Sequence, residues 1–244
     1  MSTVTVPSRT LRMMLAAVLP HADRDDMLPA LNAVLFEVRS GVLYLAATDR
    51  YGFGVARYPV PGAAAEPPPD QAALLDLTDT QNMFDRLADA DEGRPAALVI
   101  TGERLTLDSG PVDSWDCLPV DMANPWPSKT TPWWVVLGRL LTAKPCALDS
   151  QYGMDMRLPA RFSIDTGPFM PYGDPEDEPP EPEWPEEACR LRIVGEARML
   201  VTRGDWFIGA VMGHRMPKAT ATPPAWDDWK AVCEQDEAVK AGAA

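Results

Sequence analysis

The chain has 244 residues, 46% of them hydrophobic and 24% charged, so it can bury a full core in one large domain or two ordinary ones. No run of about eighteen apolar residues occurs, which excludes a membrane-spanning helix, and the N-terminus lacks the basic-then-apolar layout of a secretory signal. Four widely spaced cysteines without a Cys-x-x-Cys pair argue against a disulfide framework or a zinc site, and we expect a cytoplasmic protein.

The net charge of −14 is unevenly distributed. Residues 174–187 hold eight acidic residues and no basic one, so −14 less −8 leaves −6 for the rest of the chain. The first 61 residues hold six arginines against five acidic residues. The acidic, proline-rich stretch predicts a disordered excursion over 171–188, and mimicry of DNA is the functional alternative.

The first predicted elements are a short strand at 3–6 and a helix that Ser8 caps and that ends near Leu19, before Pro20. Arg9 and Arg12 lie one turn apart on this helix, which favours a solvated polar face. The opposite, buried face is expected to hold Leu11, Met14, Leu15 and Val18.

Three consecutive strands are predicted at 33–38, 42–48 and 53–60. Alternation in the first strand directs Val34, Phe36 and Val38 to one face and Ala33 and Leu35 to the other. The turn at 39–41 ends in a glycine that can adopt positive φ. These features predict an antiparallel meander.

The chain then resumes as a strand at 74–77 and a helix to about Ala90, capped by Thr78 or Thr80. Arg86 lies on this helix together with Asp79, Asp85 and Asp89. Its expected buried residues are Met83, Phe84 and Leu87. A hairpin at 96–101 and 104–109 follows, with a Gly-X turn at Gly102-Glu103.

The proline-punctuated stretch 121–131 predicts a crossover between two domains. Residues 133–136 fit either a strand or the start of a helix, and a helix from about Leu137 would carry Arg139 and Lys144. A strand within 156–165 is weakly indicated, whereas 190–195, 197–203 and 206–212 read as a second meander. A last helix, 225–240, has Trp226 and Trp229 one turn apart, which either pack on the second domain or plug a pocket.

Residues 28–60 resemble the first domain of the bacterial replicative sliding clamp, the β subunit of DNA polymerase III. The resemblance rests on an ordered set of residues with matching spacing. The set comprises Leu28-Pro29, Leu35, Val38, Gly41, Leu43-x-Leu45, Thr48-Asp49 and Val55-Ala56-Arg57.

The resemblance implies an α+β fold of two tandem clamp-like domains, each an antiparallel sheet backed by helices. The domains are expected at 1–120 and 132–217, with a linker and helix at 218–244. Clamp helices line a hole around duplex DNA, which makes the basic residues of these regions candidate DNA contacts. These are Arg9, Arg12, Arg24, Arg86, Arg139 and Lys144. The segment around Gly213 resembles clamp segments that border a pocket for partner peptides, so the candidate pocket residues are Val211, Met212, His214, Arg215 and Met216.

The function implied by the resemblance is a processivity factor of a bacterium or its phage that encircles double-stranded DNA and tethers polymerase and clamp loader. Clamp rings contain six domains, so a two-domain chain implies a homotrimer. The alternative is a clamp-fold interaction protein that does not close into a ring. The sequence has no phosphate-binding loop, dinucleotide fingerprint or zinc-protease motif, and we expect no enzymatic activity, cofactor or metal.

Overall fold

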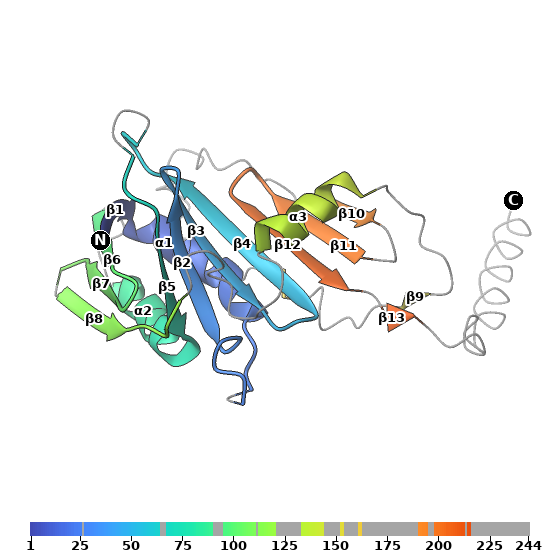
Figure 1. The fold of residues 1–244 in the computed structure, drawn as a ribbon, viewed down its shortest axis with the longest axis horizontal. Helices are drawn as coiled ribbons and strands as arrows, with labels where there is room; N and C mark the ends of the chain where they lie inside the picture. The colour runs from blue at the N-terminus through green and yellow to red at the C-terminus, as the bar shows by residue number, and fades with distance from the viewer. Residues whose placement is uncertain are drawn as a thin grey trace, which may run out of the picture.

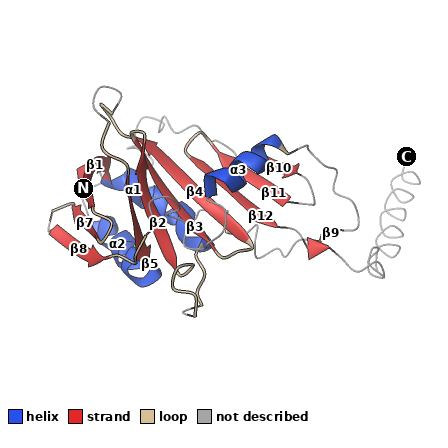
Figure 2. Cartoon of the chain, viewed as in Figure 1, coloured by secondary structure: helices blue, strands red, loops and turns tan. Residues whose placement is uncertain are grey.

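A computed structural model describes residues 1–25, 27–63, 67–89, 95–110, 112–120, 133–143, 152–153, 161–162, 190–194, 198–212 and 214–215 (Figures 1 and 2). The elements of the first 120 residues are β1 (Ser2–Pro7), α1 (Ser8–Val18), η1 (Leu19–His21), β2 (Ala33–Arg39), β3 (Val42–Thr48), β4 (Gly52–Pro59), β5 (Gln71–Asp76), α2 (Leu77–Asp89), β6 (Pro95–Ile100), β7 (Arg104–Asp108) and β8 (Val112–Asp116). The later elements are α3 (Trp133–Thr142), β9 (Tyr152–Gly153), β10 (Arg190–Val194), β11 (Arg198–Arg203), β12 (Phe207–Met212) and β13 (His214–Arg215).

Residues 2–116 contain a structural repeat. The order strand, helix and three strands occurs twice, as β1-α1-β2-β3-β4 and as β5-α2-β6-β7-β8. The first strand of each unit pairs with the other unit, because β1 adds to β6-β7-β8 and β5 adds to β2-β3-β4. Strands β4 and β8 therefore hold equivalent positions in two sheets of the same connectivity.

The sheet that contains β4 continues into the later part of the chain. Its order is β10-β11-β12-β4-β3-β2-β5, and β12 pairs antiparallel with β4 from Phe207↔Ala56 to Val211↔Gly52. The predicted meander over 190–212 is thus confirmed as three strands. It extends the first sheet, and Figure 1 shows β10, β11 and β12 beside β4.

Helices α1 and α2 pack side by side on one face of this sheet and also contact the smaller sheet. The predicted apolar face of α1 is confirmed, since all four of its residues are fully buried. The strand alternation is confirmed as well, because Val34, Phe36 and Val38 join this core and Ala33 and Leu35 join the core on the other face. The turn before Val42 has Ser40 at φ 50° and Gly41 at φ 75°, as expected for a tight hairpin.

Helix α3 covers the opposite face of the seven-stranded sheet. Its residues Trp133 and Leu140 are buried against Leu35, Val55 and Leu200. Figure 1 shows α3 on the near side of the strands and α1 on the far side. Both faces of the central strands are therefore covered, which explains why β2 is buried at six consecutive positions.

Several sequence predictions need correction. Ser8 does not cap α1, since it is already helical and buried, and Pro7 holds the capping position without a side-chain bond. Asp76, rather than Thr78 or Thr80, caps α2, because its carboxylate accepts the Asp79 N–H at 2.9 Å. Strand β8 was not predicted from its polar sequence VDSWD. The predicted hairpin across Gly102-Glu103 is confirmed by the β6–β7 pairing.

The two alternatives for residues 133–136 are resolved in favour of a helix, which begins at Trp133. Of the weakly indicated strand at 156–165, only 161–162 are described, and they form a turn. The acidic excursion at 171–188 and the helix at 225–240 lie outside the described residues.

Candidate functional site

Arg9 and Arg12 lie on the half-exposed side of α1, one turn apart, as the sequence predicts. The guanidinium carbon of Arg12 lies 4.7 Å above the ring centre of Phe84 on α2. Such a cation–π contact restrains the arginine side chain and connects the two helices. Phe84, predicted to be buried, is half-buried beneath it.

Arg86 lies on α2, and its charge is locally balanced. Its guanidinium forms an ion pair with Asp113 of β8. The same helix carries Asp79, whose pKa is raised by burial and by the neighbouring Asp76 carboxyl. The α2 surface is therefore mixed in charge.

The remaining candidate DNA contacts are dispersed. Arg24 is exposed in the loop that follows η1. Arg139 is exposed on α3, on the opposite side of the large sheet from Arg9 and Arg12. Lys144 lies outside the described residues. The structure thus gathers three arginines on the α1/α2 layer but places Arg139 on a different surface.

That surface contains a groove of about 710 Å³. It is bounded by the loop 27–31, the turn 48–53, α3, and strands β11 and β12. Val211 and Met212, two of the predicted pocket residues, line it. His214 and Arg215 form β13, paired with β9, while Met216 lies outside the described residues.

The groove has apolar walls and a basic rim. Three exposed apolar side chains lie along it, with Met27 83%, Tyr51 51% and Met212 46% exposed. The described lining residues include three arginines and no aspartate or glutamate. The arginines are Arg50, Arg139 and Arg198. A groove of this kind suits a ligand with apolar and acidic groups.

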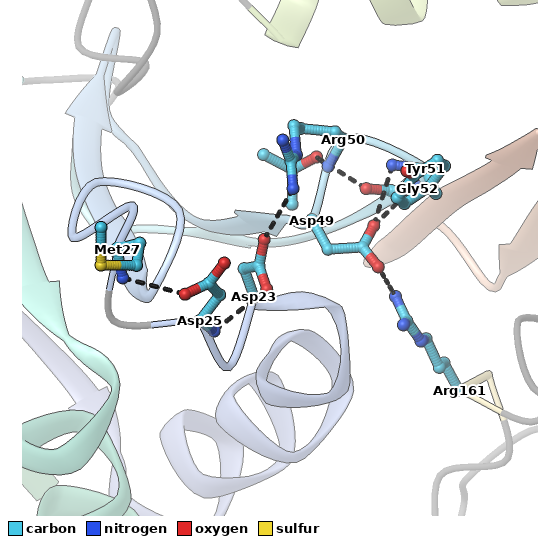
Figure 3. A network of polar contacts seen from close by, with 9 residues as sticks. Asp23, Asp25, Met27, Asp49, Arg50, Tyr51, Gly52 and Arg161 are labelled. Carbon is cyan, nitrogen blue, oxygen red and sulfur yellow. Dashed lines mark hydrogen bonds and ion pairs between the residues drawn. The ribbon is translucent and has the colours of Figure 1, made fainter.

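The turn between β3 and β4 is held by the predicted Thr48-Asp49 pair (Figure 3). One carboxylate oxygen of Asp49 accepts the N–H groups of Tyr51 at 3.0 Å and Gly52 at 2.9 Å. The other oxygen pairs with Arg161. The Thr48 hydroxyl donates to the Gly52 carbonyl at 2.6 Å. These bonds stabilise Arg50 at a φ of 78° and fix the turn that borders the groove.

The loop on the facing side is ordered by similar bonds (Figure 3). The Asp23 carboxylate accepts the Asp25 N–H at 3.1 Å, and the Asp25 carboxylate accepts the Met27 N–H at 3.0 Å. Arg50 reaches Asp23 at 3.6 Å across the two loops. The two loop walls of the groove are therefore connected to each other.

The α3 wall is positioned by two tryptophans. Trp133 donates from Nε1 to Glu37 Oε2 at 3.1 Å, and the guanidinium of Arg39 lies 3.6 Å from the ring centre of Trp134. Arg39 also pairs with Glu37 at 2.6 Å. Burial raises the pKa of Glu37, partly offset by these partners. These contacts of Trp133 and Trp134 hold α3 over the sheet, with its groove-lining residues Val136, Arg139 and Leu140.

A buried histidine lies beneath the β4–β12 junction. The ring of His21 is 4.8 Å from that of Phe162 and 6.2 Å from that of Phe207. Neither ring nitrogen has a hydrogen-bond partner among the described residues. Burial, together with the nearby charge of Arg161, lowers the pKa of His21 to about 3. This residue is a structural part of the junction.

No group of three or more His, Cys, Asp or Glu side chains that could hold a metal ion is found among the described residues. Nor does any helix in the described part of the chain have the length and apolar character needed to cross a membrane.

Most of the groove was not predicted from the sequence. Its walls come from five separate stretches, and only Val211 and Met212 were assigned to a pocket. Leu28, Pro29 and Thr48, which belong to the family pattern, all line the groove. These family-pattern residues are the signal in the sequence that could have revealed the groove.

The fold is similar to that of solved bacterial clamps. The DNA polymerase III beta subunit from Thermotoga maritima matches with a TM-score of 0.60 and 12% identity, over 89% of this chain and 66% of that one. The DNA polymerase III subunit beta from Pseudomonas aeruginosa matches at 0.58 and 11%, over 88% and 67%. The DNA polymerase sliding clamp from Bacillus subtilis matches at 0.59 and 10%, over 88% and 64%.

No protein-family model matches the sequence, and no curated protein does. At these identities the likeness shows the fold, an α+β clamp fold of antiparallel sheets backed by helices. The chain spans about two thirds of the length of the clamps it matches.

Proposed function

We propose that this protein is a DNA sliding clamp that encircles duplex DNA in the cytoplasm and tethers replication proteins. The observation that carries the proposal is the β4–β12 junction. It joins the later strands to the repeated N-terminal unit in one continuous sheet, and the resulting fold matches that of solved clamps.

Ring closure follows from the internal repeat. Strand β8 is the last strand of the second repeat unit, as β4 is the last strand of the first. The outer edge of β4 pairs with β12. No described strand pairs with the outer edge of β8. We infer that a strand of the next copy pairs there. Since the chain is two thirds as long as the clamps it matches, three copies would supply the six domains of a clamp ring.

The α1/α2 layer would face the duplex. Arg9, Arg12 and Arg86 are its basic residues, and Arg24 in the loop after η1 and Lys144 are further candidates for DNA contact. Weak and dispersed phosphate contacts suit a clamp, because it holds DNA by topology and must slide. The mixed charge of α2 agrees with a low intrinsic affinity for DNA.

The groove beside α3 would hold peptides of the polymerase and of the clamp loader. Val211 and Met212 line it, and His214, Arg215 and Met216 follow shortly after them in the chain. Peptide segments that dock in apolar grooves use a few apolar anchors together with charged flanks.

Multi-angle light scattering tests the ring. We expect a mass of about three chains of 26.7 kDa each, and we expect the protein to remain on circular DNA and to leave linear DNA. Val112→Lys should reduce the mass to that of a monomer, because Val112 is 65% exposed at the start of β8 and the lysine would block pairing. Leu141→Lys, at a 48% exposed position on α3, is the matched control and should not change the mass.

A second candidate is a clamp-fold protein that stays open and binds a clamp, polymerase or loader. The neutralisation of Arg86 by Asp113 and the placement of Arg139 away from the α1/α2 layer favour it. A monomeric mass for the wild type, with equal retention on circular and linear DNA, would select this candidate over the ring.

A further inference from the structure

The groove beside α3 has a composition that selects its occupant. Apolar residues from four segments line it, together with Arg50, Arg139 and Arg198. The described lining includes no carboxylate. An occupant with both aromatic and acidic side chains would therefore pack on the apolar walls and form ion pairs with the arginines of the rim.

The C-terminal part of this chain contains such a segment. Residues 225–237, AWDDWKAVCEQDE, hold two tryptophans, five acidic residues and a single lysine. Asp227 and Asp228 lie between Trp226 and Trp229. Tryptophan beside acidic residues matches an apolar groove with an arginine rim.

The connection is long enough to bring this segment back to the groove. Met212 lines the groove, and β13 ends three residues later at Arg215. Residues 216–225 separate Arg215 from Trp226. An extended stretch of that length spans roughly 33 Å, whereas the three residues from Met212 to Arg215 span at most about 11 Å, so the tryptophans can return to the part of the groove that Met212 lines.

We propose that the groove binds the segment 226–229 of its own chain, which then competes with partner peptides. This inference rests on the proposed role of the groove as a peptide site. Tryptophan side chains would enter the apolar part, and Asp227 and Asp228 would pair with rim arginines, Arg139 in particular, because Arg50 already pairs with Asp23. A partner peptide would have to displace the tail, so the tail would limit binding to partners with sufficient affinity.

The test uses the full-length protein and a fluorescent peptide with the sequence of residues 221–240. Fluorescence anisotropy measures its dissociation constant for the wild type and for the W226A/W229A variant. We expect the variant to bind the peptide about tenfold more tightly, because its own tail no longer competes at high effective concentration. Equal affinity for the two proteins would overturn self-occupancy.

Charge variants identify the site. In the W226A/W229A background, Arg139→Glu should weaken peptide binding at least about tenfold, and a peptide with Asp227→Lys and Asp228→Lys should recover part of the loss. Arg104→Glu, on β7, is the matched control and should bind as the background does. If Arg139→Glu and Arg104→Glu behave alike, the groove is not the site.

Two further measurements keep the test independent of the ring. Light scattering on each variant measures assembly separately. A protein that does not form a ring would therefore not be mistaken for one whose groove does not bind the tail. Peptide affinity for the wild type should not depend on protein concentration, because the competing tail belongs to the same chain. An affinity that rises on dilution would assign the tail to a neighbouring copy and overturn this form of the proposal.

Discussion

The indole N–H of Trp133 donates a hydrogen bond of 3.1 Å to the Oε2 atom of Glu37, across 96 residues of sequence. Glu37 lies in the central strand β2 and is only 2% exposed. Its second carboxylate oxygen pairs with Arg39, whose guanidinium stacks on Trp134. One buried carboxylate therefore anchors the start of α3 and with it one wall of the groove.

Trp133→Phe removes the donor and leaves one Glu37 oxygen without its buried partner. We expect the free energy of unfolding to fall by about 1–3 kcal/mol, the usual cost of an unsatisfied buried acceptor. Urea denaturation of both proteins measures the difference. Trp134→Phe is the matched control, since it keeps an aromatic ring beneath Arg39, and it should cost less. An equal loss in the two variants would show that packing, rather than the hydrogen bond, anchors α3.

Local patterns were sufficient to predict the N-terminal strands. Period-two alternation over 33–38 and a glycine at Gly41 specify a hairpin almost independently of the rest of the chain. The orientation of α3 could not be predicted in this way. Its first residues, Trp133 and Trp134, fit a strand or a helix equally well, and the face they cover depends on Glu37, which is distant in sequence.

The repeat within residues 2–116 and the groove were likewise outside the reach of local patterns. Strand β8 contains the polar residues Asp113, Ser114 and Asp116, so its sequence does not resemble that of its counterpart β4. The equivalence of β4 and β8 is recognised from the strands with which their sheets are built, and this strand pairing exists only in the folded chain. The Thr48-Asp49 pair belongs to the family pattern in the sequence, but its role in fixing a turn is visible only in the bonds of Asp49.

Stability should fall in mildly acidic solution because of His21. Its pKa is lowered to about 3 in the folded protein, against an ordinary value of 6.5. The unfolded chain therefore binds the proton more readily between these values, and the folded state loses about 1.4 kcal/mol for each pH unit below 6.5. Above that pH the effect disappears.

His21→Leu removes the titrating group while keeping an apolar side chain of similar size. Urea denaturation at about pH 7 and about pH 5 should show that the wild type loses roughly 2 kcal/mol more than the variant over this interval. Carboxylates elsewhere titrate equally in both proteins and cancel in the comparison. If wild type and variant change in parallel with pH, His21 is not protonated on unfolding in this range.

Gly54 on β4 is required by its contact with the same histidine. A Cβ atom at this position would lie 2.4 Å from His21 Cδ2. Gly54→Ala should therefore destabilise the protein by about 1–3 kcal/mol through overpacking. In a His21→Ala background the space is open and the cost should largely disappear. Urea denaturation of the four proteins in this double-mutant cycle measures the coupling.

The matched control for this cycle is Gly138→Ala. Outside the backbone of α3 and the two neighbouring residues, no atom of the described part of the chain lies within 4 Å of a Cβ at Gly138, so the added methyl should stabilise the helix by about 0.5–1 kcal/mol. A cost at Gly54 that persists without the His21 ring would show that the strand backbone, and not the histidine, rejects the methyl group.

Substitutions of Arg9, on α1, and of Arg24, in the loop that follows η1, test the proposed contacts with DNA. Arg9→Ala and Arg24→Ala should each weaken binding to a fluorescent duplex at low salt, since each would remove one phosphate contact. The slope of log K against log salt concentration should become shallower by about 0.9 for each lost contact. Fluorescence anisotropy over a series of sodium chloride concentrations gives both quantities, independently of DNA sequence.

Arg104→Ala is the control, because Arg104 lies on β7 and pairs with Asp116, away from the helical layer. Its salt slope should equal that of the wild type. Thermal unfolding of each variant separates a lost contact from a lost fold. If Arg9→Ala and Arg24→Ala keep the wild-type slope while Arg104→Ala lowers it, the duplex contacts the strand side of the molecule, and the orientation proposed for the ring must be reversed.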